Sequence, residues 1–91
     1  MELEEKVEIR NKYGLHARAS TRMAQIAQRF RSATWISRIE GTQEVDGKSI
    51  LGILTLGAER GMQIRIRVCG EDALAAMKAI TQLIDENFHE E

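Results

Sequence analysis

Two segments of the chain alternate apolar and polar residues. Residues 62–69 alternate almost without interruption, with one side formed by Met62, Ile64, Ile66 and Val68. Residues 6–10 place Val7 and Ile9 on one side and charged residues on the other. A period of two is typical of a strand that buries one face. Both segments are therefore predicted to be strands.

Two other segments repeat apolar residues at spacings of three and four, the period of an amphipathic helix. In residues 17–30 this apolar face consists of Met23, Ile26, Ala27 and Phe30. In residues 71–88 it consists of Ala73, Met77, Ile80, Ile84 and Phe88. Glu71 and Asp72 suit the first turn of the second helix, because the N-terminal end of a helix attracts negative charge. Both segments are predicted to be helices.

The middle of the chain predicts a hairpin followed by a short helix. Residues 34–39 are rich in β-branched and aromatic types, which favours a strand, and a turn at residues 40–42 allows residues 43–45 to return beside it. Ser49 precedes the mostly apolar run 50–56. Serine is a favoured N-cap, so this run is predicted to be a helix that Ser49 caps.

The predicted order is βαββαβα, which indicates an α+β fold. Strands with one apolar face need helices on that face only, so we expect a four-stranded sheet covered on one side and open to water on the other. Residues 1–91 are expected to form a single domain, because a chain of 91 residues supports one modest core. The pattern leaves open the direction of Trp35, since turning Thr34 and Ile36 inward would place Trp35 on the open face.

Composition narrows the class of protein. Cys69 is the only cysteine, so neither an internal disulfide nor a site of several thiolates can form, and we interpret it as structural. The longest nearly apolar segment, residues 50–58, is far shorter than a membrane-spanning helix, and no secretory signal is visible, so we expect a cytoplasmic protein that does not insert into membranes. No cofactor and no metal are expected.

Charge is unevenly distributed although the net charge is only -1. Between Ile9 and Ile39 the chain has no acidic residue, and its basic residues there are Arg10, Lys12, Arg18, Arg22, Arg29, Arg31 and Arg38. The net charge gives no general attraction to nucleic acid. The basic segment nevertheless suits a phosphate group or an acidic protein surface.

Residues 14–18 read GLHAR and place a histidine at the predicted start of a helix. Gly14 can adopt backbone angles closed to other residues, so the chain can turn into a helix that begins near His16. The first amides of a helix lack partners within it and attract anions, and Arg18 adds a positive charge. A neutral imidazole is a competent nucleophile near pH 7, so His16 is a candidate phosphoryl acceptor.

The chain resembles the HPr phosphocarriers of the bacterial phosphoenolpyruvate-dependent phosphotransferase system. Two motifs carry the resemblance, GLHARAS at residues 14–20 and DGKSILGILTLG at residues 46–57. The resemblance implies an open-faced β-sandwich. It also implies a carrier, and not a free-standing enzyme, that accepts a phosphoryl group from phosphorylated Enzyme I and passes it to Enzyme II components, including Enzyme IIA. Such carriers are usually monomers.

The resemblance also assigns roles to residues. His16 would be phosphorylated, by the family pattern on Nδ1, and Arg18 would stabilise the phosphate together with the backbone amides of Ala17 and Arg18. Ser49 would be the serine that an HPr kinase/phosphorylase modifies in some bacteria. The surface that docks partners would consist of Ala17, Thr21, Ile50, Leu51 and Leu54, with Arg22 at its rim.

Several alternatives stay open at this point. The family usually has proline after the active-site arginine, whereas this chain has Ala19, which should preserve the helix but loosen its first turn. The extra apolar residues of helix 50–56 either form an exposed patch or belong to the core. A regulatory paralogue or a non-catalytic α+β binding module would fit the pattern too. Nucleic-acid binding is disfavoured, because the few aromatic residues are not clustered.

Overall fold

The computed structural model describes residues 1–90, and the predicted order of elements is confirmed in this range. The elements are β1 (Glu2–Glu8), α1 (Ala17–Gln28), β2 (Ala33–Arg38), β3 (Val45–Asp46), α2 (Ile50–Thr55), β4 (Gln63–Cys69), α3 (Ala73–Asp85) and the short 3-10 helix η1 (Asn87–His89). None of the helices in residues 1–90 has the length and hydropathy needed to cross a membrane.

The strands form one antiparallel sheet in the order β1-β4-β2-β3. β1 begins earlier than predicted and pairs with the whole of β4, from Glu2 opposite Cys69 to Glu8 opposite Gln63. The prediction began this strand at residue 6, because three of the four residues 2–5 are glutamate and show no apolar alternation. On the open face, the carboxylate of Glu4 lies 3.2 Å from the guanidinium of Arg65, and that of Glu2 lies 3.7 Å from the guanidinium of Arg67. These ion pairs between the two strands add to their backbone hydrogen bonds.

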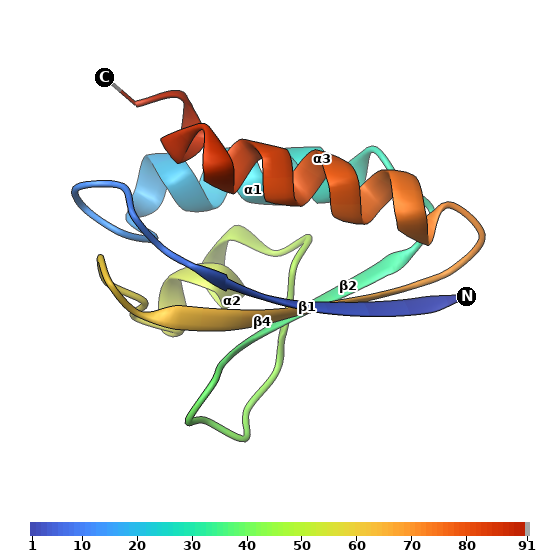
Figure 1. The fold of residues 1–91 in the computed structure, drawn as a ribbon, viewed down its shortest axis with the longest axis horizontal. Helices are drawn as coiled ribbons and strands as arrows, with labels where there is room; N and C mark the ends of the chain where they lie inside the picture. Colours follow the sequence, from blue (N-terminus) through green and yellow to red (C-terminus); the bar gives the residue numbers. More distant parts are fainter. Residues whose placement is uncertain (91) are drawn as a thin grey trace.

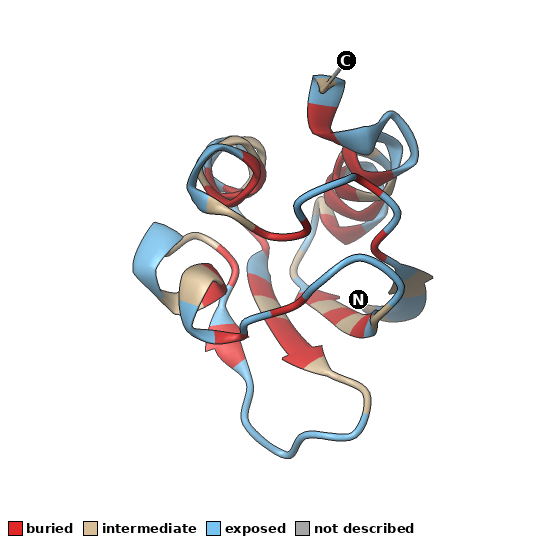
Figure 2. Ribbon diagram, turned by 90° about the vertical axis from the view of Figure 1, so that its left-hand side faces the viewer, coloured by how far each residue is buried: buried red, intermediate tan, exposed pale blue. Residues whose placement is uncertain are grey.

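Helices cover one face of this sheet, and the core lies between the two layers. Figure 1 and Figure 2 together show α1 and α3 lying side by side over the strands, and α2 adds Ile53 to the same core. The sides of the helices that face the strands are buried (Figure 2), whereas the loop at residues 40–44 is exposed. The central buried side chains include Met23, Ile36, Ile64, Ile66, Val68, Met77 and Ile80. The α+β open-faced sandwich is therefore confirmed.

The open face of the sheet carries Trp35. Its neighbours Thr34 and Ile36 are 1% and 0% exposed, so both point into the core. Side chains alternate along a strand, and Trp35 therefore lies on the opposite face, in register with Arg67 and Asp46 on the adjacent strands. Cys69, at the end of β4, is exposed and has a free thiol.

The last predicted helix, residues 71–88, is shorter in the structure. α3 ends at Asp85, and Asn87, Phe88 and His89 have φ values of 53°, 57° and 62°, the left-handed region. Each such residue costs about 1 kcal/mol or more, and burying one phenylalanine returns about 1.5–3 kcal/mol. Phe88 is 0% exposed, as predicted, but its burial alone returns no more than the three left-handed residues together cost. Polar contacts must therefore help to hold this turn.

The start of α3 also differs from the prediction, since Glu71 and Asp72 precede the helix instead of forming its first turn. The Asp72 carboxylate accepts hydrogen bonds from the Ser32 hydroxyl and from the backbone N–H groups of Arg31 and Ser32, at 2.5–2.9 Å. These bonds, chiefly that from the Ser32 hydroxyl, lower the pKa of Asp72 from 3.8 to about 2. Asp72 thus joins the start of α3 to the loop after α1.

We predict that Asp72→Asn reduces the dependence of stability on acid pH. A carboxyl group whose pKa is lowered by folding stabilises the protein above its ordinary pKa, and this contribution disappears as the pH falls from about 4 to about 2. The free energy of unfolding, measured by urea titration across this range, should fall less steeply in the variant than in the wild type. Asp85→Asn, which removes an exposed carboxylate from the other end of α3, is the control. Equal slopes for Asp72→Asn and the wild type would contradict the prediction.

Candidate functional site

The loop before α1 is fixed by a close approach of two backbone segments. Gly14 has a φ of 65°, and the N–H of Leu15 donates to the carbonyl of Ala58 at 2.9 Å. A Cβ on Gly14 would lie 2.5 Å from that same carbonyl oxygen. Glycine is therefore needed for both its backbone angles and its size, as the sequence predicted for the angles.

His16 is the N-cap of α1. Its backbone is extended, and its ring Nδ1 accepts the N–H of Arg18 at 3.2 Å. The carbonyl of His16 accepts the N–H of Ser20 at 2.8 Å, which is the first hydrogen bond of the helix. The ring of Tyr13 packs edge-on against the imidazole, with 6.0 Å between ring centroids. The sequence placed His16 near this helix end, and the structure places it in the cap itself.

These contacts distinguish the two nitrogens of the imidazole. Because Nδ1 accepts a hydrogen bond, it carries a lone pair, and in the neutral ring the proton belongs to Nε2. Nε2 contacts a carboxylate oxygen of Glu90, which accepts that proton in a hydrogen bond. The lone pair of Nδ1 therefore faces the amide end of α1, and the proton faces Glu90.

A hollow of about 450 Å³ surrounds this side of His16. It is lined by Lys12, Tyr13, His16, Arg18, Arg22, His89 and Glu90. Three permanent cations meet there, which agrees with the basic segment seen in the sequence. That segment contains no acid, but the fold brings Glu90 into the hollow from the opposite end of the chain. The side chain of His16 is 29% exposed, so the ring is accessible from solvent.

Asn11 and Arg22 hold the segment that carries Glu90. The amide of Asn11, which is 2% exposed, donates to the carbonyl of Gly14 at 2.8 Å and to the Glu90 carboxylate oxygens at 3.2 and 3.3 Å. The guanidinium of Arg22 donates to the carbonyl of Phe88. Sequence reasoning missed Asn11 and Glu90, since they are 79 positions apart and neither belongs to a motif.

The predicted docking residues lie on α1 and α2, two helices that pack against each other. Leu51 is 74% exposed and Ile50 is 37% exposed, whereas Ile53 is buried. The alternative that all apolar residues of α2 belong to the core is therefore wrong for Ile50 and Leu51. We define the docking patch as the predicted set Ala17, Thr21, Ile50, Leu51 and Leu54, with Arg22 at its rim; Ala17 is exposed, and Thr21, Arg22 and Leu54 are half-buried.

Ser49 caps α2 as predicted. Its Oγ accepts the N–H of Gly52 at 3.0 Å, and its carbonyl accepts the N–H of Ile53 at 3.0 Å. The hydroxyl is therefore engaged within the protein. The residue is half-buried. This geometry accounts for a serine at position 49 through the helix cap alone.

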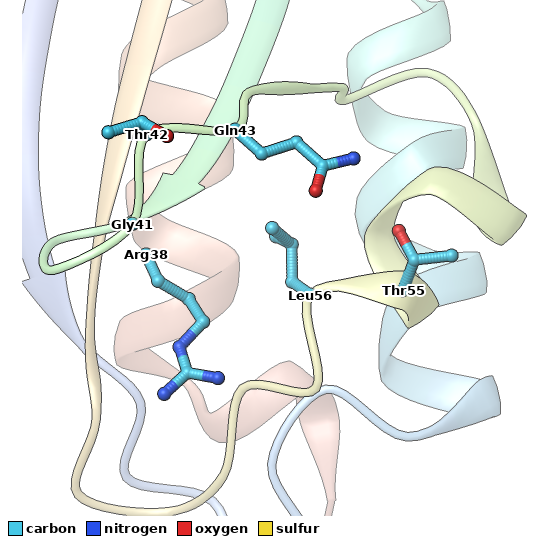
Figure 3. Close-up of a pocket in the computed structure, with 6 residues that line it drawn as sticks. All are labelled: Arg38, Gly41, Thr42, Gln43, Thr55 and Leu56. Atoms are coloured by element: carbon cyan, nitrogen blue, oxygen red, sulfur yellow. The ribbon is translucent and has the colours of Figure 1, made fainter.

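A second hollow, of about 340 Å³, lies between the β2–β3 loop and the end of α2. Figure 3 shows the side chains of Gln43 and Leu56 pointing toward each other across it. Arg38 lines the hollow, but its guanidinium is bound to Glu40 at 2.7 Å, and this hydrogen bond lowers the pKa of Glu40. None of its residues belongs to the predicted site, so the hollow at His16 is the stronger candidate.

Comparison with known proteins identifies the family. The family model described as "PTS HPr component phosphorylation site" matches residues 3–86. The chain is 42% identical over 88 residues to the phosphocarrier protein HPr of Neisseria meningitidis, covering 97% of each chain. It is 41% identical over 88 residues to the phosphocarrier protein NPr of Shewanella violacea, covering 97% of this chain and 94% of that one.

A solved structure agrees with this result. The crystal structure of HPr-C-His from Thermoanaerobacter tengcongensis superimposes with a TM-score of 0.91 at 38% sequence identity, covering 98% of each chain. Sequence and fold therefore match over nearly the whole chain, and the matched region includes both His16 and Ser49. The chain belongs to the HPr family of phosphocarrier proteins of the phosphotransferase system.

Proposed function

We propose that this protein carries a phosphoryl group on His16, accepting it from phosphorylated Enzyme I and donating it to Enzyme II components. The observation that carries the proposal is the position of the Nδ1 lone pair at the amide end of α1, beside Lys12, Arg18 and Arg22. This arrangement offers a nucleophile and a binding site for an anion at one place. It matches the atom that the family resemblance implies.

The reaction is a transfer between two nucleophiles. The lone pair of Nδ1 forms a bond to phosphorus while the bond from phosphorus to the leaving atom of the donor breaks, and that atom keeps the electron pair. The N–H of Arg18, which Nδ1 releases, becomes available to an oxygen of the phosphoryl group, together with the N–H of Ala17 at the first helical position. One donor group thus serves the ring before transfer and the phosphate after it.

Electrostatics favour the transfer at this position. Phosphoryl transfer depends mostly on alignment and on stabilising negative charge, with little need for other protein chemistry. The exposed Arg18 lines the hollow and supplies a cation beside the phosphoryl oxygens, and the helix dipole of α1 adds partial positive charge. In the second transfer, an acceptor protein's nucleophile bonds to phosphorus while the bond from Nδ1 to phosphorus breaks, and the same groups stabilise the phosphoryl oxygens.

The docking patch provides a surface for successive partners. Its exposed leucine and isoleucine belong to α2, which packs against the helix that His16 caps, so a partner that covers them can also reach that helix. A small apolar patch with a charged rim suits brief complexes, because few contacts need to be released when partners exchange.

We predict that His16→Ala abolishes phosphoryl transfer and that His89→Ala preserves it. His89 is the matched control, since it is the other histidine of the chain and lines the same hollow, but it caps no helix. Incubation with Enzyme I, Mg²⁺ and labelled phosphoenolpyruvate should give acid-labile label on the wild type and on His89→Ala only. If the folded wild type takes up no label from a competent Enzyme I, the protein is better explained as a non-catalytic binding module.

We predict that Leu51→Asp lowers kcat/KM for transfer from Enzyme I by about tenfold or more, because a central apolar contact of an interface commonly contributes more than 1 kcal/mol. Leu74→Asp is the control, since Leu74 is also exposed, at 52%, but lies at the start of α3, away from His16. Both variants should retain wild-type circular dichroism. Equal kcat/KM values for the two variants would argue against docking through α2.

We predict that Ser49→Ala lowers the free energy of unfolding by about 1 kcal/mol through loss of the N-cap.

Regulation is tested separately with an HPr kinase and ATP, which should place acid-stable label on the wild type if Ser49 is a kinase target, as the family resemblance implies. Label that persists in Ser49→Ala would exclude that site. Thr55→Ala is a matched control for the labelling, because its hydroxyl lies on the same helix.

A further inference from the structure

We infer that Glu90 is a positioning residue for His16: its carboxylate holds the proton on Nε2 and thereby keeps Nδ1 free to attack phosphorus. The inference rests on the proposed phosphoryl transfer at His16. It assigns a function to a residue that lies outside both motifs, 74 positions from the histidine.

The contact is partly withdrawn from water. The side chains of His16 and Glu90 are 29% and 15% exposed, and the carboxylate contacts Nε2 directly. Ion-pair and hydrogen-bond partners shielded from solvent interact more strongly than partners on an open surface. The neutral imidazole can place its proton on either nitrogen, so an acceptor fixed at Nε2 selects the form whose lone pair is on Nδ1.

Glu90 is itself held in place. Asn11 donates to both of its carboxylate oxygens, and the same amide group donates to the carbonyl of Gly14, in the loop that leads into the cap. In the described chain the Oδ1 of Asn11 is buried without a hydrogen-bond partner. All the hydrogen bonds of this side chain are therefore donated by its Nδ2 atom. The buried Phe88 and its carbonyl contact with Arg22 anchor the segment just before Glu90.

The arrangement suits the charge that develops during transfer. When Nδ1 forms its bond to phosphorus, the ring still bears the Nε2 proton and becomes cationic. The carboxylate lies on that proton, so it stabilises the cation, and no proton has to leave the ring. In serine proteases an aspartate acts through the second nitrogen of a histidine in a comparable way, by fixing the tautomer and stabilising the imidazolium.

A different role for the same contact would be obstruction. A carboxylate resembles a phosphate in charge and could occupy its place in the hollow. Against this, Glu90 contacts Nε2, whereas the lone pair that attacks phosphorus is on Nδ1, which faces the amides of α1. The carboxylate therefore leaves the attacking nitrogen and the amide of Arg18 accessible.

The experiment compares Glu90→Ala and Glu90→Gln with Glu86→Gln, a matched control that removes a carboxylate from the same segment without touching His16. Nitrogen-15 NMR of the His16 ring, with Enzyme I absent, reports which nitrogen carries the proton. Transfer from phosphorylated Enzyme I gives kcat/KM. Glu90→Ala leaves only the N–H of Arg18, at 3.2 Å from Nδ1, to select the tautomer. We therefore expect this variant to populate the second tautomer more than the wild type does and to lower kcat/KM about tenfold, the effect of losing a hydrogen bond to a charged group.

Glu90→Gln separates the two parts of the role, because its amide oxygen can still accept the Nε2 proton but carries no charge. It should keep the wild-type tautomer and show an intermediate kcat/KM, while Glu86→Gln matches the wild type in both measurements. Unchanged tautomer and rate in Glu90→Ala would overturn the inference, and a faster Glu90→Ala would establish obstruction instead. If neither the wild type nor any variant accepts a phosphoryl group from Enzyme I, the proposed function fails. The NMR comparison still decides in that case whether Glu90 fixes the tautomer of His16.

Discussion

The amide end of α1 is the constraint on which the site depends. The first N–H groups of a helix have no partners within it, so something outside the helix must accept them. In this protein the acceptor at Arg18 is the ring of His16, and the ring is therefore oriented by the same hydrogen bond that completes the helix. In the proposed transfer, a phosphoryl group on Nδ1 would meet these donors while the backbone keeps its helical form. The proposed nucleophile and the donors for an anion are aligned because both belong to one helix cap.

Tertiary contacts, and not proline, fix this cap. The family usually has proline at the position of Ala19, yet α1 begins at Ala17 with the cap intact. The loop is held by the bond from Leu15 to Ala58 and by the Ser20 hydroxyl, which donates to the carbonyl of Leu15 at 3.0 Å. Each bond links the loop to a segment that is itself packed in the core. These contacts restrict the same backbone that a proline ring would restrict directly, so the loss of proline does not remove the geometry of the site.

The features that the sequence predicted are those that neighbouring residues determine. The periodicity of β4 and α1, the cap at Ser49 and the histidine at a helix start all depend on short-range patterns, and the structure has each of them. Features that depend on distant segments were missed. The Asp72 carboxylate binds the loop after α1, 40 residues or more away, so its charge gave a misleading signal for the first turn of α3. The Phe88 side chain fitted the helical stripe, but its backbone leaves the helix.

The same distinction explains why the charge map of the sequence was incomplete at His16. A stretch without acids suggested a purely positive site, which would attract phosphate but would leave the proton of the imidazole without an acceptor. The two ring nitrogens have different requirements. In the proposed transfer the partner of Nδ1 must be exchangeable, because phosphorus takes its place, and the backbone N–H of Arg18 meets this need because it can then donate to the phosphate. The partner of Nε2 must stay throughout the transfer, and a carboxylate fixed by the buried Asn11 meets it. One acid among three cations would therefore serve the proposed transfer better than none, because the acid would act on the proton and leave the phosphate to the cations.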